Sequence, residues 1–283
     1  MADQPLTINN VAVPRFLYGT AWKEDATEQL TTLALEAGFR GIDTANQRKH
    51  YYEEGVGRAI QAALDSGRIS REELFLQTKF TFMRGQDHRL PYDSNASIST
   101  QVEQSFASSL EHLGVNHIDS YVLHGPTFGR GIHDNDMEAW KAIEGLFEGG
   151  AIRLVGVSNV SLDQLQTLYK TAGVKPAFVQ NRCYAATGWD YEVRRFCSEN
   201  DVIYQGFSLL TANRGVWQGA AVAALAAKYS RTPAQVIFRF CIDAGMLPLT
   251  GTSDPDHMQE DLNVAGWNLE KDEILLLQSI GVA

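Results

Sequence analysis

Short apolar segments alternate with longer amphipathic segments about eight times along the chain, and this alternation limits the fold more than any other feature. The short segments are rich in β-branched and aromatic residues, which is typical of buried strands. They cover residues 15–18, 41–44, 74–79, 120–124, 154–158, 177–180, 202–207 and 247–250. Because strands that alternate with helices lie parallel, the pattern predicts an α/β fold with a parallel sheet.

The segments between these strands carry the signals that begin and end helices. Helices are expected over 26–37, 97–113, 136–148, 161–170, 190–200, 220–229 and 270–279. Gly38, Gly114 and Gly149 follow the first three, since glycine accepts the left-handed backbone of a helix end. Thr232-Pro233 predicts a further helix to about Asp243, with threonine as N-cap and proline in the first turn.

Eight such units fit a (β/α)8 barrel, or TIM barrel, which takes roughly 250 residues. An open doubly wound sheet would need a glycine-rich phosphate turn after its first strand, and Tyr18-Gly19-Thr20-Ala21-Trp22 does not match that motif. Asn9-Asn10 lies between two apolar triplets and predicts an N-terminal β-hairpin that plugs the bottom of the barrel. Without a linker-like segment, we expect residues 1–283 to form a single domain with a short C-terminal helix.

The composition argues against several functional classes. Because 24 Lys and Arg face 34 Asp and Glu, the net charge is −10, and no overall positive field attracts nucleic acid or an anionic membrane. The longest apolar stretch, residues 219–227, is too short to cross a bilayer. Cys183, Cys197 and Cys241 include no C-x-x-C pair, and the histidines form no H-E-x-x-H cluster. The sequence therefore predicts neither disulfides nor a metal site, and a reducing, cytoplasmic location.

Polar residues stand where three successive strands end. Asp43, Lys79 and His124 occupy these positions. Each of them alone is more often a helix cap, a solvated side chain or a loop hydrogen-bonding group. In a barrel, however, the carboxyl ends of all strands converge on one mouth, and a buried charge there must be paired. We therefore expect the three side chains to face one another.

Five blocks in this order resemble the aldo-keto reductase superfamily. They are Gly41-Ile42-Asp43-Thr44-Ala45, Glu53-Glu54-Gly55-Val56-Gly57, Gln77-Thr78-Lys79, Leu123-His124-Gly125-Pro126 and Gly156-Val157-Ser158-Asn159, and the match covers nearly the whole chain. The resemblance implies a (β/α)8 barrel that reversibly reduces aldehydes and ketones to alcohols with a nicotinamide cofactor. An alternative within the same fold is a redox-sensing regulatory subunit that binds the cofactor and turns over slowly.

The family's catalytic set is Asp, Tyr, Lys and His, so the resemblance assigns Asp43, Lys79 and His124 directly. Tyr51 and Tyr52 both remain candidates for the tyrosine. Family members with a Lys-His-Tyr-x-Glu segment use the first tyrosine as the acid, which favours Tyr51. In this interpretation the tyrosine protonates the nascent alkoxide, and the Lys79 ammonium lowers the pKa of the phenol. Asp43 is expected to keep Lys79 charged, and His124 to orient the carbonyl.

The resemblance also implies a cofactor site. Its residues are Gly19, Thr20, Ser158, Asn159, Gln180, Phe207, Ser208, Leu210, Gly251, Thr252, His257, Glu260 and Asp261. Ser158, Asn159 and Gln180 would hold the nicotinamide carboxamide. Phe207 would stack on the ring, and the loop with Ser208 and Leu210 would meet the diphosphate. Glu260 and Asp261 would contact the adenine.

One part of that site departs from the family pattern. NADPH-preferring members carry Lys-Ser or Lys-Thr and a later Arg toward the 2′-phosphate, and here Gly251-Thr252 and His257 stand instead. The loss of two permanent cations should weaken discrimination between the cofactors. Backbone N–H groups of a helix that begins near Pro255 offer another phosphate anchor. We expect NADP(H) as first choice, with NAD(H) as the second candidate.

The expected substrate is a small carbonyl compound in a wide pocket. Gly125 replaces a tryptophan that walls the pocket in many members, and the chain ends soon after its last helix, without the long tail of larger relatives. Aromatic residues in loops are candidates to line the pocket again. They are Trp22, Phe80, Phe128, Trp189 and Trp217.

Overall fold

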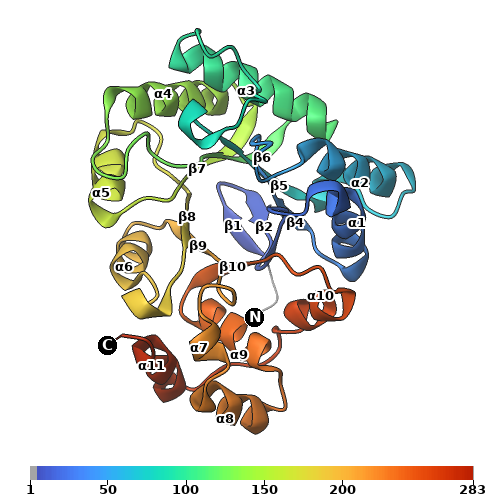
Figure 1. Cartoon of the computed structure of the whole chain (residues 1–283), viewed down its shortest axis with the longest axis vertical. Helices are drawn as coiled ribbons and strands as arrows, with labels where there is room; N and C mark the ends of the chain where they lie inside the picture. Colours follow the sequence, from blue (N-terminus) through green and yellow to red (C-terminus); the bar gives the residue numbers. More distant parts are fainter. Residues whose placement is uncertain (1–4, 283) are drawn as a thin grey trace.

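Eight parallel strands close into a barrel in the computed structural model, which describes residues 5–282 (Figure 1). The strands are β3 (Leu17–Gly19), β4 (Gly41–Asp43), β5 (Phe75–Phe80), β6 (Ile118–Leu123), β7 (Ile152–Ser158), β8 (Phe178–Arg182), β9 (Ile203–Phe207) and β10 (Met246–Thr250). Each pairs with the next along the chain, and β10 returns to pair with β3. The predicted (β/α)8 barrel and its eight strands are confirmed.

Helices surround the barrel, and all except α2 and the short α7 lie where the sequence predicts them. They are α1 (Thr27–Ala37), α2 (Glu53–Asp65), α3 (Ile98–Leu113), α4 (Asp134–Glu148), α5 (Leu162–Thr171), α6 (Tyr191–Glu199), α7 (Arg214–Trp217), α8 (Ala220–Tyr229), α9 (Pro233–Asp243), α10 (Pro255–Leu262) and α11 (Lys271–Ser279). Gly38 and Gly114 adopt the expected left-handed backbone, whereas after α4 this role falls to Gly150 instead of Gly149. Thr232 caps α9 as predicted.

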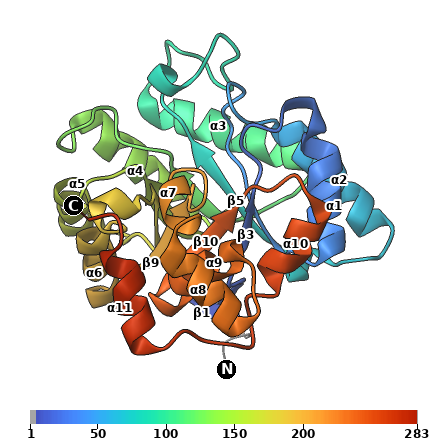
Figure 2. The same cartoon turned by 60° about the horizontal axis from the view of Figure 1, so that its bottom comes forward.

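The last third of the chain adds a second shell of helices on one side. Helix α9 packs against β10, and α8 and α11 pack outside α9 (Figure 2). The expected C-terminal helix is therefore confirmed as α11. Among residues 5–282, no helix combines the length and the hydrophobicity that crossing a membrane requires.

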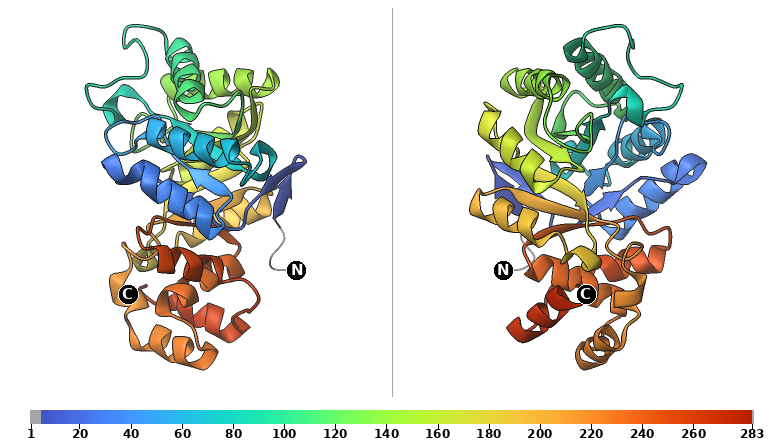
Figure 3. Two further views of the ribbon diagram at one scale, coloured as in Figure 1. Left: turned by 90° about the vertical axis from the view of Figure 1, so that its right-hand side faces the viewer. Right: turned by 60° about the vertical axis from the view of Figure 1, so that its left-hand side comes forward.

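The N-terminal hairpin is also confirmed. Strands β1 (Leu6–Ile8) and β2 (Val11–Val13) pair antiparallel around Asn9 and Asn10, whose φ angles of 48° and 64° are those of a tight hairpin turn. Val11 and Val13 pack against residues at the beginnings of barrel strands, such as Leu17 and Phe75. The hairpin lies across the centre of the ring in Figure 1 and on the side of the N-terminus in Figure 3. It therefore closes the amino end of the barrel.

Helix α2 is the main element that the sequence pattern does not predict. Gly55 and Gly57 lie in its first turns, and glycine lowers helix propensity. A Cβ atom on Gly57 would lie 1.9 Å from the carbonyl oxygen of His112 at the end of α3. The close approach of α2 and α3 therefore requires glycine here, and tertiary packing outweighs local preference.

Gly57→Ala should lower the stability of the fold by about 1–3 kcal/mol, because the added methyl group has to displace the backbone of α3. Thermal unfolding followed by circular dichroism measures the effect. Gly145→Ala in α4 is the matched control, since a Cβ there meets no atom within 4 Å. It should stabilise the protein by about 0.5–1 kcal/mol. Equal effects of both variants would refute the packing explanation.

Candidate active site

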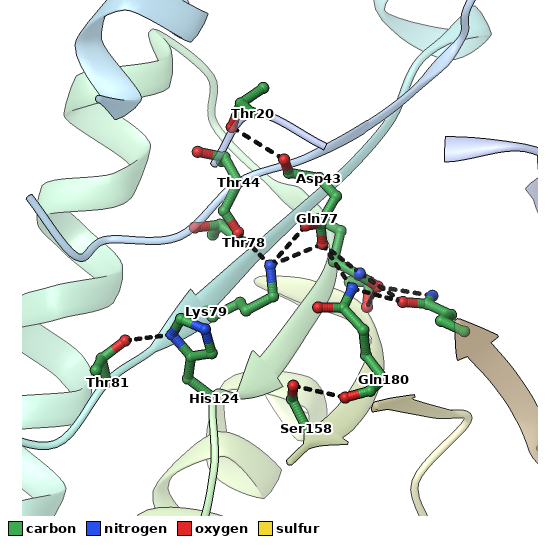
Figure 4. A network of polar contacts seen from close by, with 12 residues as sticks. Thr20, Asp43, Thr44, Gln77, Thr78, Lys79, Thr81, His124, Ser158 and Gln180 are labelled. Carbon is green, nitrogen blue, oxygen red and sulfur yellow. Dashed lines mark hydrogen bonds and ion pairs between the residues drawn. The ribbon is translucent and has the colours of Figure 1, made fainter. Parts of the chain in front are cut away.

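A buried ion pair lies at the carboxyl end of the barrel (Figure 4). Asp43 ends β4, and Lys79 lies near the end of the neighbouring β5. The Lys79 Nζ donates to both carboxylate oxygens of Asp43 and to the carbonyl oxygen of Thr44, each at 2.8 Å. Lys79 is 0% exposed and Asp43 3%. Burial lowers the pKa of Lys79, and the Asp43 charge opposes that shift. The expected pairing of these two residues is confirmed.

Amide side chains inside the barrel complete the surroundings of the carboxylate. The Nε2 atoms of Gln77 and Gln180 donate to Asp43 Oδ1 at 2.7 and 2.9 Å, and both also donate to Gln205 Oε1. Sequence reasoning missed Gln77 and Gln205. The signal was available for Gln77, since it lies two residues before Lys79 on one strand, and side chains two apart share a face.

Tyr51 lies between the ion pair and His124. Its ring centre is 5.3 Å from the Lys79 Nζ and 5.9 Å from the His124 ring centre, with an edge-to-face arrangement. Tyr52 instead is the N-cap residue before α2, and its ring contacts the guanidinium groups of Arg48 and Arg58. Of the two candidate tyrosines, only Tyr51 lies beside the ion pair and the histidine.

The pKa of Tyr51 differs from the prediction. Burial, and then the negative charge of Asp43, raise the pKa of the phenol above its ordinary value. The Lys79 ammonium was expected to lower this pKa, but all of its hydrogen bonds go to Asp43 and Thr44, so Asp43 largely offsets its charge. The Tyr51 hydroxyl therefore stays protonated at neutral pH.

His124 is held as a neutral imidazole. Its Nδ1 lies 2.7 Å from the Thr81 hydroxyl, which fixes the orientation of the ring. Burial, followed by the charges of Lys79 and His50, lowers the pKa of His124 to about 3. If the Thr81 hydroxyl donates to Nδ1, the ring proton is on Nε2, and this nitrogen is a hydrogen-bond donor.

A cavity of about 1060 Å³ opens at this end of the barrel. Most of the predicted site residues line it, namely Gly19, Asp43, Tyr51, His124, Ser158, Gln180, Phe207, Ser208, Leu210, Gly251, Thr252, His257, Glu260 and Asp261. Three others are not part of its lining; Lys79 and Thr20 are buried, whereas Asn159 is exposed. Lys79 is covered, Thr20 donates to the Asp43 carbonyl oxygen at 3.0 Å, and the Asn159 side chain donates to the His124 carbonyl oxygen at 2.8 Å.

The polar residues of the middle of the cavity are ordered by internal hydrogen bonds. The Ser158 hydroxyl donates to the backbone oxygen of Gln180 at 2.6 Å. The amide nitrogen of Gln180 is used inside the barrel, whereas its Oε1 accepts no hydrogen bond from the described residues. Ser208 follows the half-buried Phe207 with a left-handed φ of 58°, and its hydroxyl accepts from Arg182. The Gln180 amide oxygen thus has no hydrogen-bond donor among the described residues, and the Phe207 ring lines the cavity with the Arg182 guanidinium 5.9 Å from its centre.

The far end of the cavity is acidic. Asp254 caps α10, and its Oδ1 accepts from the backbone N–H groups of Asp256 and His257 at 2.8 and 3.2 Å. Glu260 and Asp261 line the cavity beside them, and burial raises the pKa of Asp261 to about 7. The predicted phosphate anchor at this helix N-terminus is therefore wrong, because a carboxylate already occupies these N–H groups.

Lys23 is a cavity residue that sequence reasoning missed. It is the sole lysine or arginine in the cavity wall of the described chain, and it is 8% exposed. Its Nζ donates to the Gly251 carbonyl oxygen at 2.8 Å and lies over the Tyr18 ring, and no ion pair joins it to a described carboxylate. Burial lowers the pKa of Lys23 to about 8. The sequence signal that could have placed Lys23 in the cavity was its position in the loop after the first barrel strand.

The five aromatic candidates differ in position, and Phe128 is 53% exposed and contacts His133 outside the cavity lining. Phe80 and Trp189 are 0% exposed and belong to the core. Trp22 and Trp217 line the cavity, and Trp22 is 69% exposed. Its ring stacks on the ring of His50, which also lines the cavity and was not predicted there.

The model of the Aldo/keto reductase family matches residues 17–281. The chain belongs to the aldo/keto reductase family. The methylglyoxal reductase DkgA of Escherichia coli (strain K12) is 30% identical over 256 residues, which are 89% of this chain and 84% of that relative. An aldo-keto reductase of Mycolicibacterium paratuberculosis is 32% identical over 262 residues, covering 91% of this chain and 82% of the relative.

Solved structures of aldo-keto reductases share the barrel. One from a deep-sea metagenome library of the Medee basin superposes with a TM-score of 0.83 at 25% identity, covering 97% of this chain and 94% of the other. One complexed with NADPH has the same TM-score at 22% identity, covering 98% and 87%. Family membership makes this chain an NAD(P)H-dependent oxidoreductase that acts on carbonyl compounds.

Asp43→Asn should lower the free energy of unfolding by about 3–5 kcal/mol, because it leaves the Lys79 ammonium buried without a counter-charge. Urea denaturation measures this. Glu36→Gln, which breaks the exposed ion pair with Arg68, is the control and should have a much smaller effect. If the two substitutions destabilise the protein equally, the buried pair does not have the importance assigned to it.

Proposed function

We propose that this reductase converts aldehydes and ketones to alcohols, with Tyr51 as the proton donor. One observation carries the proposal: the Tyr51 ring lies beside both the buried Lys79 ammonium and the neutral His124 ring, at the wall of a large cavity. When bound, the nicotinamide cofactor supplies the hydride. The protein must then stabilise the negative charge that develops on the carbonyl oxygen and protonate it.

Each side chain has a separate task in this mechanism. Tyr51 is fully protonated before reaction, because its pKa is raised, and it releases its proton only to a strong base such as a nascent alkoxide. The Lys79 ammonium stabilises the phenolate that remains. His124 donates a hydrogen bond from Nε2 to the carbonyl oxygen and orients it. Asp43 holds Lys79 in place and does not react.

The residues of the cavity fit a nicotinamide cofactor. The free Oε1 of Gln180 would accept a hydrogen bond from the nicotinamide carboxamide, together with a contact from Ser158. Asn159, which is exposed next to Ser158, is proposed as a further contact by family resemblance. Phe207 would stack on the ring, and the loop at Ser208 and Leu210 would meet the diphosphate. Gly19 and Thr20 would shape the wall beside it.

Discrimination between the two cofactors is proposed to be weak. NADP(H) is the first choice by family resemblance, with NAD(H) also accepted. The adenosine end presents Gly251, Thr252 and His257 instead of permanent cations, and Glu260 and Asp261 lie next to them. A 2′-phosphate would therefore gain little binding energy at the adenosine end of the cavity, since a neutral histidine offers at most one hydrogen bond.

Lys23 is proposed to bind the diphosphate of the cofactor with its positive charge. A buried ammonium without a carboxylate partner is unfavourable, and an anion in the cavity would relieve that cost. Because Lys23 is anchored on Gly251, near the ends of β3 and β10, the diphosphate common to both cofactors is the group it would contact.

Tyr51→Phe should reduce carbonyl turnover by at least about 100-fold, because it removes the proton donor. Cofactor binding, followed by quenching of protein fluorescence, should persist. Tyr52→Phe is the control and should keep activity. Activity lost in the Tyr52 variant and kept in the Tyr51 variant would reverse the assignment, and slow turnover of the unaltered protein with every aldehyde would favour a regulatory subunit.

Lys23→Met should weaken binding of NADP⁺ and NAD⁺ by about tenfold each, measured by fluorescence titration at pH 7. In the unaltered protein, affinity should fall as the pH rises through about 8, since Lys23 then loses its charge. Lys23→Arg should keep affinity without this pH dependence, because arginine remains charged. A loss confined to NADP⁺ would place Lys23 at the 2′-phosphate instead.

A further inference from the structure

Arg182 ends strand β8 at the mouth of the barrel, and the proposed mechanism leaves it without a role. The pairing of β8 with β9 places Arg182 directly opposite Phe207. Gln180 and Arg182 are two residues apart on one strand, so their side chains share a face, and Gln180 donates to Asp43 inside the barrel. Arg182 therefore lies one layer above Gln180, toward the carboxyl end of the barrel.

The exposed Arg182 guanidinium is held by neutral groups. Its Nε donates to the Ser208 hydroxyl at 3.2 Å, and its Nη1 donates to the Tyr184 hydroxyl at 3.3 Å. Its Cζ lies 5.9 Å from the centre of the Tyr184 ring and 5.9 Å from the centre of the Phe207 ring. Within residues 5–282, no carboxylate forms an ion pair with Arg182. The guanidinium thus keeps its positive charge beside Phe207 without a counter-charge.

The backbone around this group is held in place as well. The Cys183 N–H donates to the Phe207 carbonyl oxygen at 3.1 Å, and Asn213 Nδ2 donates to the Cys183 carbonyl oxygen at 2.9 Å. Ser208 has a left-handed φ of 58°, which is costly outside glycine and persists only where the surrounding structure enforces it. The two strands and the loop after β9 therefore fix the position of Arg182 relative to Phe207.

The two redox forms of a nicotinamide cofactor differ in charge only at the nicotinamide ring. The oxidised ring is cationic and the reduced ring is neutral, whereas the phosphates are the same in both forms. A ring stacked on Phe207 would lie within about 10 Å of the Arg182 guanidinium. Two unit charges at this distance near a protein surface repel each other enough to change a binding constant by about two- to tenfold.

We propose that Arg182 makes the cavity select the reduced cofactor over the oxidised one, because its charge repels the cationic form of a nicotinamide ring stacked on Phe207. This inference rests on the proposed function, which stacks the ring there. Arg182 is outside the cavity lining and transfers nothing, so it is a positioning residue that acts across the Phe207 ring. The other cations of the site are balanced, Lys79 by Asp43 and Lys23 by the diphosphate that it is proposed to bind.

This selection serves carbonyl reduction. Each turnover begins with reduced cofactor and leaves oxidised cofactor in the cavity, and weaker binding of the oxidised form favours its release. The same guanidinium opposes the positive charge that the ring gains when hydride leaves. The benefit of Arg182 therefore lies in cofactor exchange and not in the hydride step.

The test measures the dissociation constants of NADP⁺ and NADPH by fluorescence titration at low ionic strength. For Arg182→Met, the ratio of the NADP⁺ constant to the NADPH constant should fall about threefold, since only the cationic ring is relieved of repulsion. Arg182→Lys keeps the charge and should keep the ratio within about 1.5-fold. Arg195→Met is the matched control, because Arg195 lies on α6, pairs with Glu192 and does not line the cavity.

The ratio separates an electrostatic role from a structural one. A structural role of Arg182 would weaken both redox forms equally and leave the ratio unchanged in Arg182→Met, which would overturn the inference. An equal fall of the ratio in Arg182→Lys would overturn it too. In the unaltered protein the ratio should also fall in about 1 M NaCl, because salt screens the repulsion. A ratio that does not respond to salt would overturn the inference without any substitution.

The proposed function fails in a different way. If the ratio changed as expected but Tyr51→Phe still reduced aldehydes at full rate, the proposed proton donor would be wrong and the role of Arg182 would stand. If Tyr51→Phe abolished reduction and the ratio stayed constant, only the role of Arg182 would be wrong. An unaltered protein that bound neither NADP⁺ nor NADPH would refute both.

Discussion

The buried ion pair of Asp43 and Lys79 is the interaction on which the rest of the site depends. Removing two charges from water is costly, and their attraction offsets that cost only with good geometry and further hydrogen bonds. The barrel supplies both, since Gln77 and Gln180 donate to the same carboxylate oxygen that Lys79 contacts. These residues come from three different strands, so the pair is satisfied only when the barrel is closed.

The same pair positions the segment that carries Tyr51. Lys79 donates from its side chain to the Thr44 carbonyl oxygen, and its own carbonyl oxygen accepts from the Asn46 backbone. The turn that follows brings the Tyr51 backbone N–H to Gln47. The tyrosine is thus attached to the ion pair through the backbone, and a change at Asp43 should disturb both electrostatics and geometry.

Charge is distributed unevenly along the cavity. Its inner end holds a neutralised ion pair and two uncharged imidazoles, whereas its outer end holds Glu260 and Asp261. Lys23 lies between them as a buried cation without a counter-charge. This arrangement suits a ligand whose phosphates lie in the middle of the cavity, in agreement with the cofactor proposal.

The alternation of apolar and amphipathic segments by itself determined the barrel and the convergence of Asp43, Lys79 and His124, and the Asn9-Asn10 turn determined the hairpin. Strand, helix and turn signals are local properties of the chain. The tertiary structure alone decided what depends on distant contacts. Helix α2 needs glycine because α3 lies against it, Gln77 meets Gln205 only across the closed barrel, and Asp254 takes the helix N-terminus that a phosphate was expected to use. The raised pKa of Tyr51 and the burial of Lys23 belong to the same group, since desolvation depends on everything packed around a side chain and no short stretch of sequence records it.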